Sequence, residues 1–251
     1  MHGENKNMVL KSVSIGRGVS WITEAFPYFS RNPLGWIAAI IVFFILSIVF
    51  ELIPFGFVIV NIFYPVIIGG YMLGCMAHYQ GNSFEFQHLF AGFREPYFKR
   101  LTLLGVFYLI ALLMIVVLTV ILIIAILGSM EIFQQIERGQ IDDVSAYTEE
   151  FLLFLLVLAT LILPLIMAMW FAPAIIIQTD KAAHSAMILS FNACMKNILP
   201  FTLYGLVVLI LAIIAAIPLL LGYLVLLPVL SASVYVAFLD CFEINTADSS
   251  L

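Results

Sequence analysis

The chain of 251 residues is too apolar to be an ordinary soluble protein. Hydrophobic residues make up 64% of it and charged residues 10%, whereas a typical globular domain has about 45–50% apolar and about 25% charged residues. Too little polar material remains to cover a core, so the composition excludes a soluble fold and predicts a surface that faces lipid. The net charge of −5 argues against a nucleic-acid partner.

The first residues are expected to remain in the cytoplasm. Residues 1–14 are predicted to form a flexible cytoplasmic tail, and the first continuous apolar run begins only at Ile37. That run is too long for the core of a signal peptide, so no cleavable signal peptide is expected.

Six apolar runs are long enough to cross a bilayer, which takes roughly 20 helical residues at about 1.5 Å rise per residue. The fold class predicted from them is all-α, a polytopic membrane protein with six transmembrane helices in a single membrane domain. For the last pair, which has the fewest residues, a re-entrant hairpin is the alternative. The predicted spans are residues 34–52, 57–78, 101–128, 151–177, 199–217 and 221–238.

The positions of Lys and Arg predict the orientation. Four precede the first span, three lie between the second and third, and two lie between the fourth and fifth, whereas only Arg138 lies in the loop after the third. Short loops rich in Lys and Arg remain in the cytoplasm. Both termini are therefore expected inside a bacterial inner (plasma) membrane. The acidic loop of residues 129–150 is expected outside.

A weak internal repeat is predicted, with an interfacial amphipathic helix followed by a two-span hairpin in each unit. Chance similarity between three apolar hairpins is the alternative. The units are residues 15–79, 80–177 and 178–243, followed by a tail at 244–251. Each second span contains a proline: Pro65, Pro164 or Pro228. The expected faces of the amphipathic runs are Ile15, Val19, Ile22, Phe26 and Phe29; Phe86, Leu89, Phe90, Phe93 and Tyr97; and Ala183, Met187, Phe191 and Cys194.

Two sets of residues are the candidates for contacts with lipid and between helices. Small residues allow helices to approach closely in lipid, and the spacing Gly70-x-x-x-Gly74 favours packing within the chain over a dimer interface. The candidate packing residues are Gly69, Gly70, Gly74, Ala168 and Ala232. The candidate contacts to lipid headgroups are Arg17, Arg31, Arg94, Lys99, Arg100 and Lys196. Interfacial aromatic anchors are expected at Trp21, Tyr28, Trp36, Tyr97 and Phe98.

The pattern of titratable residues predicts no catalytic, cofactor-binding or metal-binding residue. No charged residue lies in the middle of a span, where an ion path would need one. No CxxC or HExxH spacing occurs, and no phosphate-binding glycine loop or GxSxG motif. Asn61, the most notable polar residue inside a span, is expected to bond a neighbouring helix.

The opening of the chain resembles that of an uncharacterised family of bacterial inner-membrane proteins. The likeness rests on Gly16-Arg17-Gly18, Trp21, Glu24, the Phe29–Pro33 run and Trp36. In outline the chain is also similar to the membrane domain fused to some glycerophosphodiester phosphodiesterases. It lacks any phosphodiesterase domain, so this resemblance implies no activity.

Two classes of function remain open. The absence of catalytic groups beside well-developed interfacial helices favours a non-enzymatic membrane component: a scaffold, an accessory protein or a lipid-organising protein. Its partners would be membrane lipids, with a membrane-protein partner or a homo-oligomer undetermined. The repeat instead favours a transporter or flippase-like protein for an apolar or amphipathic small solute. That alternative predicts a central cavity with several polar groups, whereas the first requires none.

Overall fold

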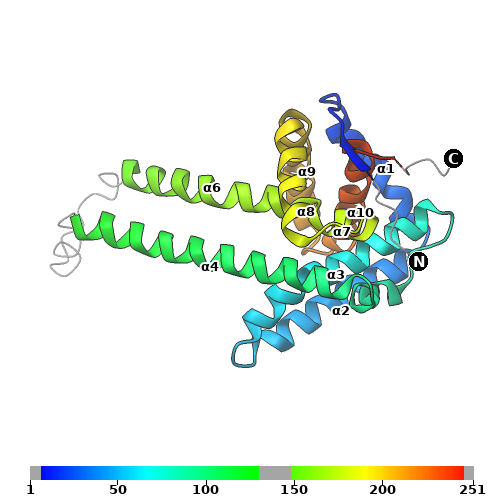
Figure 1. Cartoon of the computed structure of the whole chain (residues 1–251), viewed down its shortest axis with the longest axis horizontal. Coiled ribbons are helices and arrows are strands. Elements are labelled where there is room, and N and C mark those ends of the chain that lie inside the picture. Colours follow the sequence, from blue (N-terminus) through cyan, green and yellow to red (C-terminus); the bar gives the residue numbers. More distant parts are fainter. Residues whose placement is uncertain (1–6, 130–147, 246–251) are drawn as a thin grey trace.

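The computed structural model describes residues 7–129 and 148–245, and the polypeptide in these ranges is almost entirely helical (Figure 1). The predicted acidic loop lies outside the described residues except for its ends, as do 1–6 and 246–251 of the predicted tails. The described helices are α1 (Arg17–Ser30), α2 (Pro33–Glu51), α3 (Gly56–Tyr79), the 3₁₀-helix η1 (Phe86–Phe93), α4 (Phe98–Ser129), α6 (Thr148–Trp170), α7 (Ala172–Gln178), α8 (Ala183–Lys196), α9 (Ile198–Ala216) and α10 (Tyr223–Cys241).

Six segments in the described residues are long and apolar enough to cross a membrane, with α6 and α7 counted as one. They coincide with the six predicted spans to within a few residues, so the all-α fold class and the number of candidate spans are confirmed. α9 and α10 have 19 residues each, within the range of about 17–25 that a spanning helix needs. Both helices of the last pair are therefore long enough to span a bilayer.

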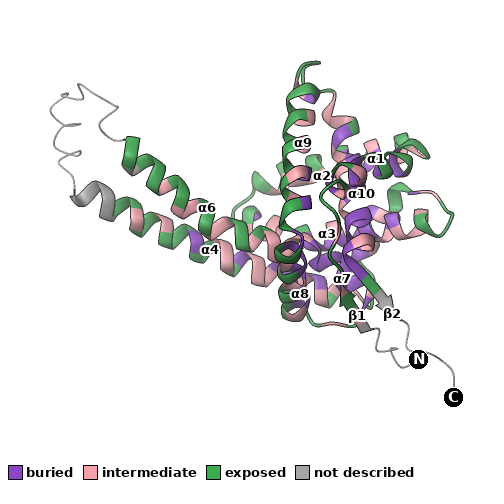
Figure 2. Ribbon diagram, turned by 90° about the horizontal axis from the view of Figure 1, so that it is seen from above, coloured by how far each residue is buried: buried purple, intermediate pink, exposed green. Residues whose placement is uncertain are grey.

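The spans form three hairpins that diverge from a common base. The first hairpin is α2–α3, the second is α4 with α6 and α7, and the third is α9–α10 (Figure 1). Buried residues concentrate where the bases meet, and most residues along the projecting part of α4 and α6 are exposed (Figure 2). The base holds fully buried aromatic side chains, among them Trp21, Trp36, Phe171, Tyr235 and Phe238.

Each short helix packs on the hairpin that precedes it. η1 rests on α3 and α2 of the first hairpin, and α8 rests on α6, α7 and α4 of the second. α1 closes the ring, because it packs on α10 and α9 of the third hairpin. This cyclic arrangement ties the two ends of the chain together.

A two-stranded ribbon strengthens that closure and was not predicted from the sequence. Strand β1 (Asn7–Leu10) pairs antiparallel with β2 (Phe242–Asn245), with Leu10 opposite Phe242. Lys11 then donates its amide hydrogen to the carbonyl of Cys241, and its ammonium lies 3.0 Å from the Glu243 carboxylate. Part of the predicted N-terminal tail is therefore a paired strand.

The fourth span is broken between α6 and α7, where one continuous helix was expected. A regular helix would pair the amide of Phe171 with the carbonyl of Met167. Ser190 of α8 lies between them instead: its hydroxyl accepts from Phe171 N at 2.9 Å and donates to Met167 O at 2.7 Å. A side chain inserted into the backbone ladder is a recognised cause of a helix break. Pro173, near the start of α7, has no amide hydrogen to restore the ladder.

Two local expectations were wrong. Trp21, Tyr28 and Trp36 are buried and not interfacial anchors, since their rings pack in the base and are at most 8% exposed. Asn61 does not bond another helix but donates to Phe57 O one turn earlier in α3. Of the predicted apolar face of the first amphipathic run, Ile22 and Phe29 are buried, and Ile15, Val19 and Phe26 are exposed.

Candidate functional site

An ionic cluster joins the start of α1 to the end of α10. The Arg17 guanidinium makes a bidentate pair with Glu24, at 2.6 and 2.8 Å, and bonds Asp240 Oδ2 at 2.5 Å. These bonds to Glu24 and then Asp240 raise the pKa of Arg17 above its ordinary value. Trp21 Nε1 donates to the same oxygen of Asp240 at 2.7 Å. The cluster satisfies its own charges, so it is a structural clasp and not a group of free titratable residues.

Polar side chains at the junctions between short helices and spans hold the next part of the ring. Asn32 caps α2 through Gly35 N and donates to Phe84 O, two residues before η1. Arg100, in the first turn of α4, donates to Thr179 O, four residues before α8. Asn197, ahead of α9, donates to Lys11 O in the segment before α1. Each of these three side chains thus donates a hydrogen bond to a backbone carbonyl in the segment that precedes the next short helix.

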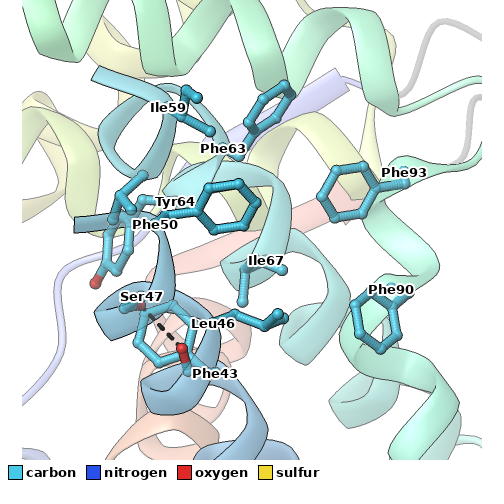
Figure 3. A pocket seen from close by; sticks show the side chains of 11 residues that line it. Phe43, Leu46, Ser47, Phe50, Ile59, Phe63, Tyr64, Ile67, Phe90 and Phe93 are labelled. Carbon is cyan, nitrogen blue, oxygen red and sulfur yellow. Dashed lines mark hydrogen bonds between the residues drawn. The ribbon is translucent and has the colours of Figure 1, made fainter. Parts of the chain in front are cut away.

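The first hairpin and η1 enclose an apolar groove of about 570 Å³ (Figure 3). It runs from Phe50 and Ile59, near the loop end of the hairpin, to Phe90 and Phe93 of η1 at the base. Ser47 is committed to its own helix, because its hydroxyl donates to Phe43 O at 2.9 Å. The groove therefore offers an almost wholly hydrocarbon surface to whatever lies in it.

A similar groove of about 610 Å³ lies on the third hairpin beneath α1. Ile22 and Phe26 of α1 take the place that Phe90 and Phe93 of η1 have on the first hairpin. Both short helices end at an arginine, since Arg31 is the C-cap of α1 and Arg94 is the C-cap of η1. Two of the three hairpins thus combine an apolar groove with a short helix that ends at an arginine.

A third cavity, of about 390 Å³, lies where the three hairpins meet and is lined by residues of all of them. Its walls are mainly aliphatic and aromatic, and none of the described residues that line it is charged. Its polar lining residues are Tyr64, Tyr71, Tyr108, Trp170, Tyr204 and Ser231. The polar atoms Tyr71 Oη and Trp170 Nε1 are buried and have no hydrogen-bond partner among the described residues.

The predicted headgroup residues lie along the base but are not equally available. Arg17 is held in the ionic cluster, and Arg31 donates to Gly81 O. Arg100 bonds Thr179 O, and Lys196 bonds Leu10 O. Arg94 and Lys99 are exposed, and no hydrogen bond or ion pair within the described ranges engages their side chains. They are the cations best placed to bind an external anion.

The predicted small residues lie at close approaches within the chain. A Cβ at Gly70 would clash with the backbone carbonyls of His88 and Leu89 in η1, and one at Gly74 would clash with the Phe84 ring. Gly69 lies against Leu101 of α4. Ala232 is fully buried, and Ala168 is half-buried.

Comparison with known proteins gives one distant match. The chain is similar to a probable inner membrane protein of Burkholderia thailandensis. The two are 26% identical over 207 residues, which cover 79% of this chain and 74% of that protein. No protein-family model matches the chain, and no solved structure is significantly similar.

The sequence did not predict which buried polar side chains would hydrogen-bond the backbone of other segments. Ser190 and Asn197 lie on the α8 side of the third unit and are buried, yet a serine or asparagine beside an apolar helix carries no sequence signal of its partner. Burial also raises the pKa of the Cys194 thiol to about 12, so it stays protonated and donates weakly to Met167 O. Within 7–129 and 148–245, no three His, Cys, Asp or Glu residues converge as a metal site would require.

Proposed function

We propose that the chain is a non-enzymatic integral protein of a bacterial inner membrane that binds and organises phospholipid. In five of the six candidate spans of the described residues, less than half of the most apolar window is buried, and in the window of the fourth span none is. Such a surface needs acyl chains around it. The inner-membrane location is supported by the similarity to the Burkholderia thailandensis protein, which bears that description.

The observation that carries the proposal is the groove on the first hairpin, with two available cations at its base. Arg94 follows Phe93 directly, and consecutive Cα atoms are only about 3.8 Å apart. Lys99 follows Phe98, whose ring packs on Phe63 and Phe93 of the groove, with centroids 6.2 and 5.7 Å apart. An anionic phospholipid can therefore lay one acyl chain in the groove and set its phosphate beside Arg94 and Lys99.

The double variant Arg94→Gln/Lys99→Gln is expected to bind dioleoyl phosphatidylglycerol about 30-fold more weakly. Each cation near an anionic lipid contributes about 1 kcal/mol, and about 1.4 kcal/mol corresponds to a factor of ten in affinity. The measurement is a lipid titration of the purified full chain in micelles, followed by native mass spectrometry. Binding of dioleoyl phosphatidylcholine should change little.

Two matched variants distinguish binding of the lipid headgroup from binding of its acyl chain. Lys181→Gln removes a cation that lies away from this groove, and its affinity should stay within about twofold of the parent. Val60→Trp fills the groove and should weaken both lipids alike. Equal binding of the two lipids by the parent chain, or no effect of the Arg94/Lys99 change, would contradict the proposal.

We also propose that the three units are repeats. This is supported by the cyclic packing of α1, η1 and α8, each on the preceding hairpin. It is supported too by the junction contacts of Asn32, Arg100 and Asn197. A proline inside the second helix of each hairpin adds to it. The likeness to the phosphodiesterase-linked membrane domain stays part of this proposal and implies no catalysis.

Both termini are proposed to lie in the cytoplasm. Green fluorescent protein fused after Leu251 should fluoresce, while alkaline phosphatase at the same point should be inactive. Alkaline phosphatase inserted at Arg138 should be active, because the predicted acidic loop faces the periplasm. An active phosphatase after Leu251 would reverse the orientation.

A transporter or flippase-like role is the second candidate. The observation that favours it is the cavity at the junction of the hairpins, since repeat-built transporters bind their substrates near such an interface. Reconstituted vesicles that accumulate or flip a short-chain lipid only with the protein present would support this role.

A further inference from the structure

The junction cavity contains buried polar groups that the fold does not use. Tyr71 is 2% exposed, and its hydroxyl has no partner among the described residues. Its ring lies beside the stacked pair of Trp36 and Phe84, with its centroid 5.7 and 5.9 Å from theirs. The indole N–H of Trp170 is also buried without a partner. Buried polar groups are normally hydrogen-bonded, so two unpaired ones in one cavity indicate a ligand site.

The other polar groups of the cavity are accounted for or belong to its rim. Tyr204 Oη is bonded to Ser233 Oγ at 2.7 Å, and Ser231 donates to Leu227 O at 2.9 Å. Tyr64 is 42% exposed and Tyr108 is half-buried, and neither hydroxyl is among the buried polar atoms without a partner. The buried groups of the cavity that lack a hydrogen-bond partner are therefore the hydroxyl of Tyr71, on the first hairpin, and the indole N–H of Trp170, on the second.

The chemistry of these groups defines the ligand class. An indole N–H can only donate, and a phenol hydroxyl donates well, so the ligand must present an acceptor. No described lining residue is charged, so a carboxylate or phosphate would be desolvated without compensation. The remaining walls are apolar, from residues such as Ile68, Met72, Val208 and Leu230.

We propose that this cavity binds an uncharged, lipid-soluble molecule through a carbonyl oxygen that accepts from Tyr71 or Trp170. Its volume of about 390 Å³ lies in the usual range for a small-molecule site, about 300–1,000 Å³. Membrane quinones and the ester carbonyls of diacylglycerols share this chemistry. This is the same cavity that favours the transporter candidate, but binding there does not require transport. The cavity is separate from the groove beside Arg94.

The test is equilibrium binding to the purified full chain in micelles with four probes. Decylubiquinone and 1,2-dioctanoylglycerol carry carbonyl oxygens, decylbenzene carries no acceptor, and decyl phosphate is charged. Binding of either carbonyl probe, at least tenfold tighter than decylbenzene and decyl phosphate, supports the site, and the tighter of the two identifies the source. Equal binding of all four probes, or binding of neither carbonyl probe, overturns it.

Conservative variants distinguish a binding role from a structural one. Tyr71→Phe keeps the stacked ring and removes an unpaired hydroxyl, so it should unfold at the same or a higher temperature while binding the carbonyl probe about fivefold more weakly. Trp170→Phe should likewise weaken binding, and the double variant should weaken it further. Tyr223→Phe is the control, because Tyr223 does not line the cavity; it breaks the bond to Ala212 O and should lower the unfolding temperature with binding within about twofold. A Tyr71→Phe variant that loses stability, or binds unchanged, overturns the assignment.

Discussion

Replacing Asn197 by alanine is expected to destabilise the fold by about 2–4 kcal/mol. The side chain is 1% exposed and makes three hydrogen bonds: it accepts from Val13 N at 2.9 Å and donates to Lys11 O and Ala193 O at 2.9 and 3.0 Å. Each bond contributes about 1 kcal/mol net, and backbone groups left unpaired in a buried place cost about 1–3 kcal/mol. Thermal and denaturant unfolding of the purified full chain in detergent measures the loss.

The segment ahead of α1 should loosen at the same time. Limited proteolysis should cut near Lys11 sooner in the Asn197→Ala variant than in the parent, because Asn197 and the β1–β2 ribbon hold this segment together. Asn197→Asp tests donation separately, since a carboxylate can still accept from Val13 N but cannot donate to the two carbonyls. It should be destabilised at least as much as the alanine variant.

Asn192 provides the control. It is exposed on the same helix, so Asn192→Ala should change stability by no more than about 0.5 kcal/mol. Equal stability of the Asn192→Ala and Asn197→Ala variants would mean that the junction contacts do not hold the ring closed.

The spans could be predicted because the signal that defines them is local. Fourteen uncharged residues from Ile37 to Phe50 already require a lipid-facing or buried helix, whatever lies around them. The start of α2 was equally local: Asn32 caps it and Pro33 occupies its first position, as the dipeptide predicts. In both cases the residues that cause the structure are adjacent in sequence.

The base of the hairpins could not be predicted because its contacts join distant residues. Trp21 and Trp36 were predicted as interfacial anchors, but both are buried. Trp21 packs on Phe201 and Tyr204 of the third hairpin, and Trp36 stacks on Phe84. The same holds for Asp240, whose carboxylate meets Arg17 across 223 positions of sequence. Nothing in a single sequence encodes such a partner.

The candidate sites divide in the same way. Arg94 and Lys99 were candidates from the sequence because they lie just ahead of a span, and the structure shows both exposed. The junction cavity could not be predicted, since Tyr71 and Trp170 come from different hairpins and count as ordinary apolar-span aromatics. They become candidates for ligand binding only because the structure buries the Tyr71 hydroxyl and the Trp170 indole N–H without a partner among the described residues.

Replacing Ser190 by alanine is the second change with a large expected effect, about 2–4 kcal/mol of lost stability. The hydroxyl is the only link that the described residues provide between Phe171 N and α8, and it also satisfies Met167 O. Both backbone groups lie in the packed base, where each unpaired group costs about 1–3 kcal/mol. The helix could recover by closing the direct bond from Phe171 to Met167, but that would move α7, of which residues Ala172–Ile177 are all buried.

Hydrogen exchange distinguishes these two responses. If α7 stays in place, the Phe171 amide should exchange faster in Ser190→Ala than in the parent, with the loss of stability seen in thermal unfolding. Ser185→Ala, half-buried on the same helix and away from the break, should stay within about 0.5 kcal/mol of the parent. If the Ser190→Ala variant is as stable as the parent and its Phe171 amide exchanges slowly, the fourth span prefers to be one continuous helix. The bend between α6 and α7 in the parent would then depend on the Ser190 bridge, and packing alone would not impose it.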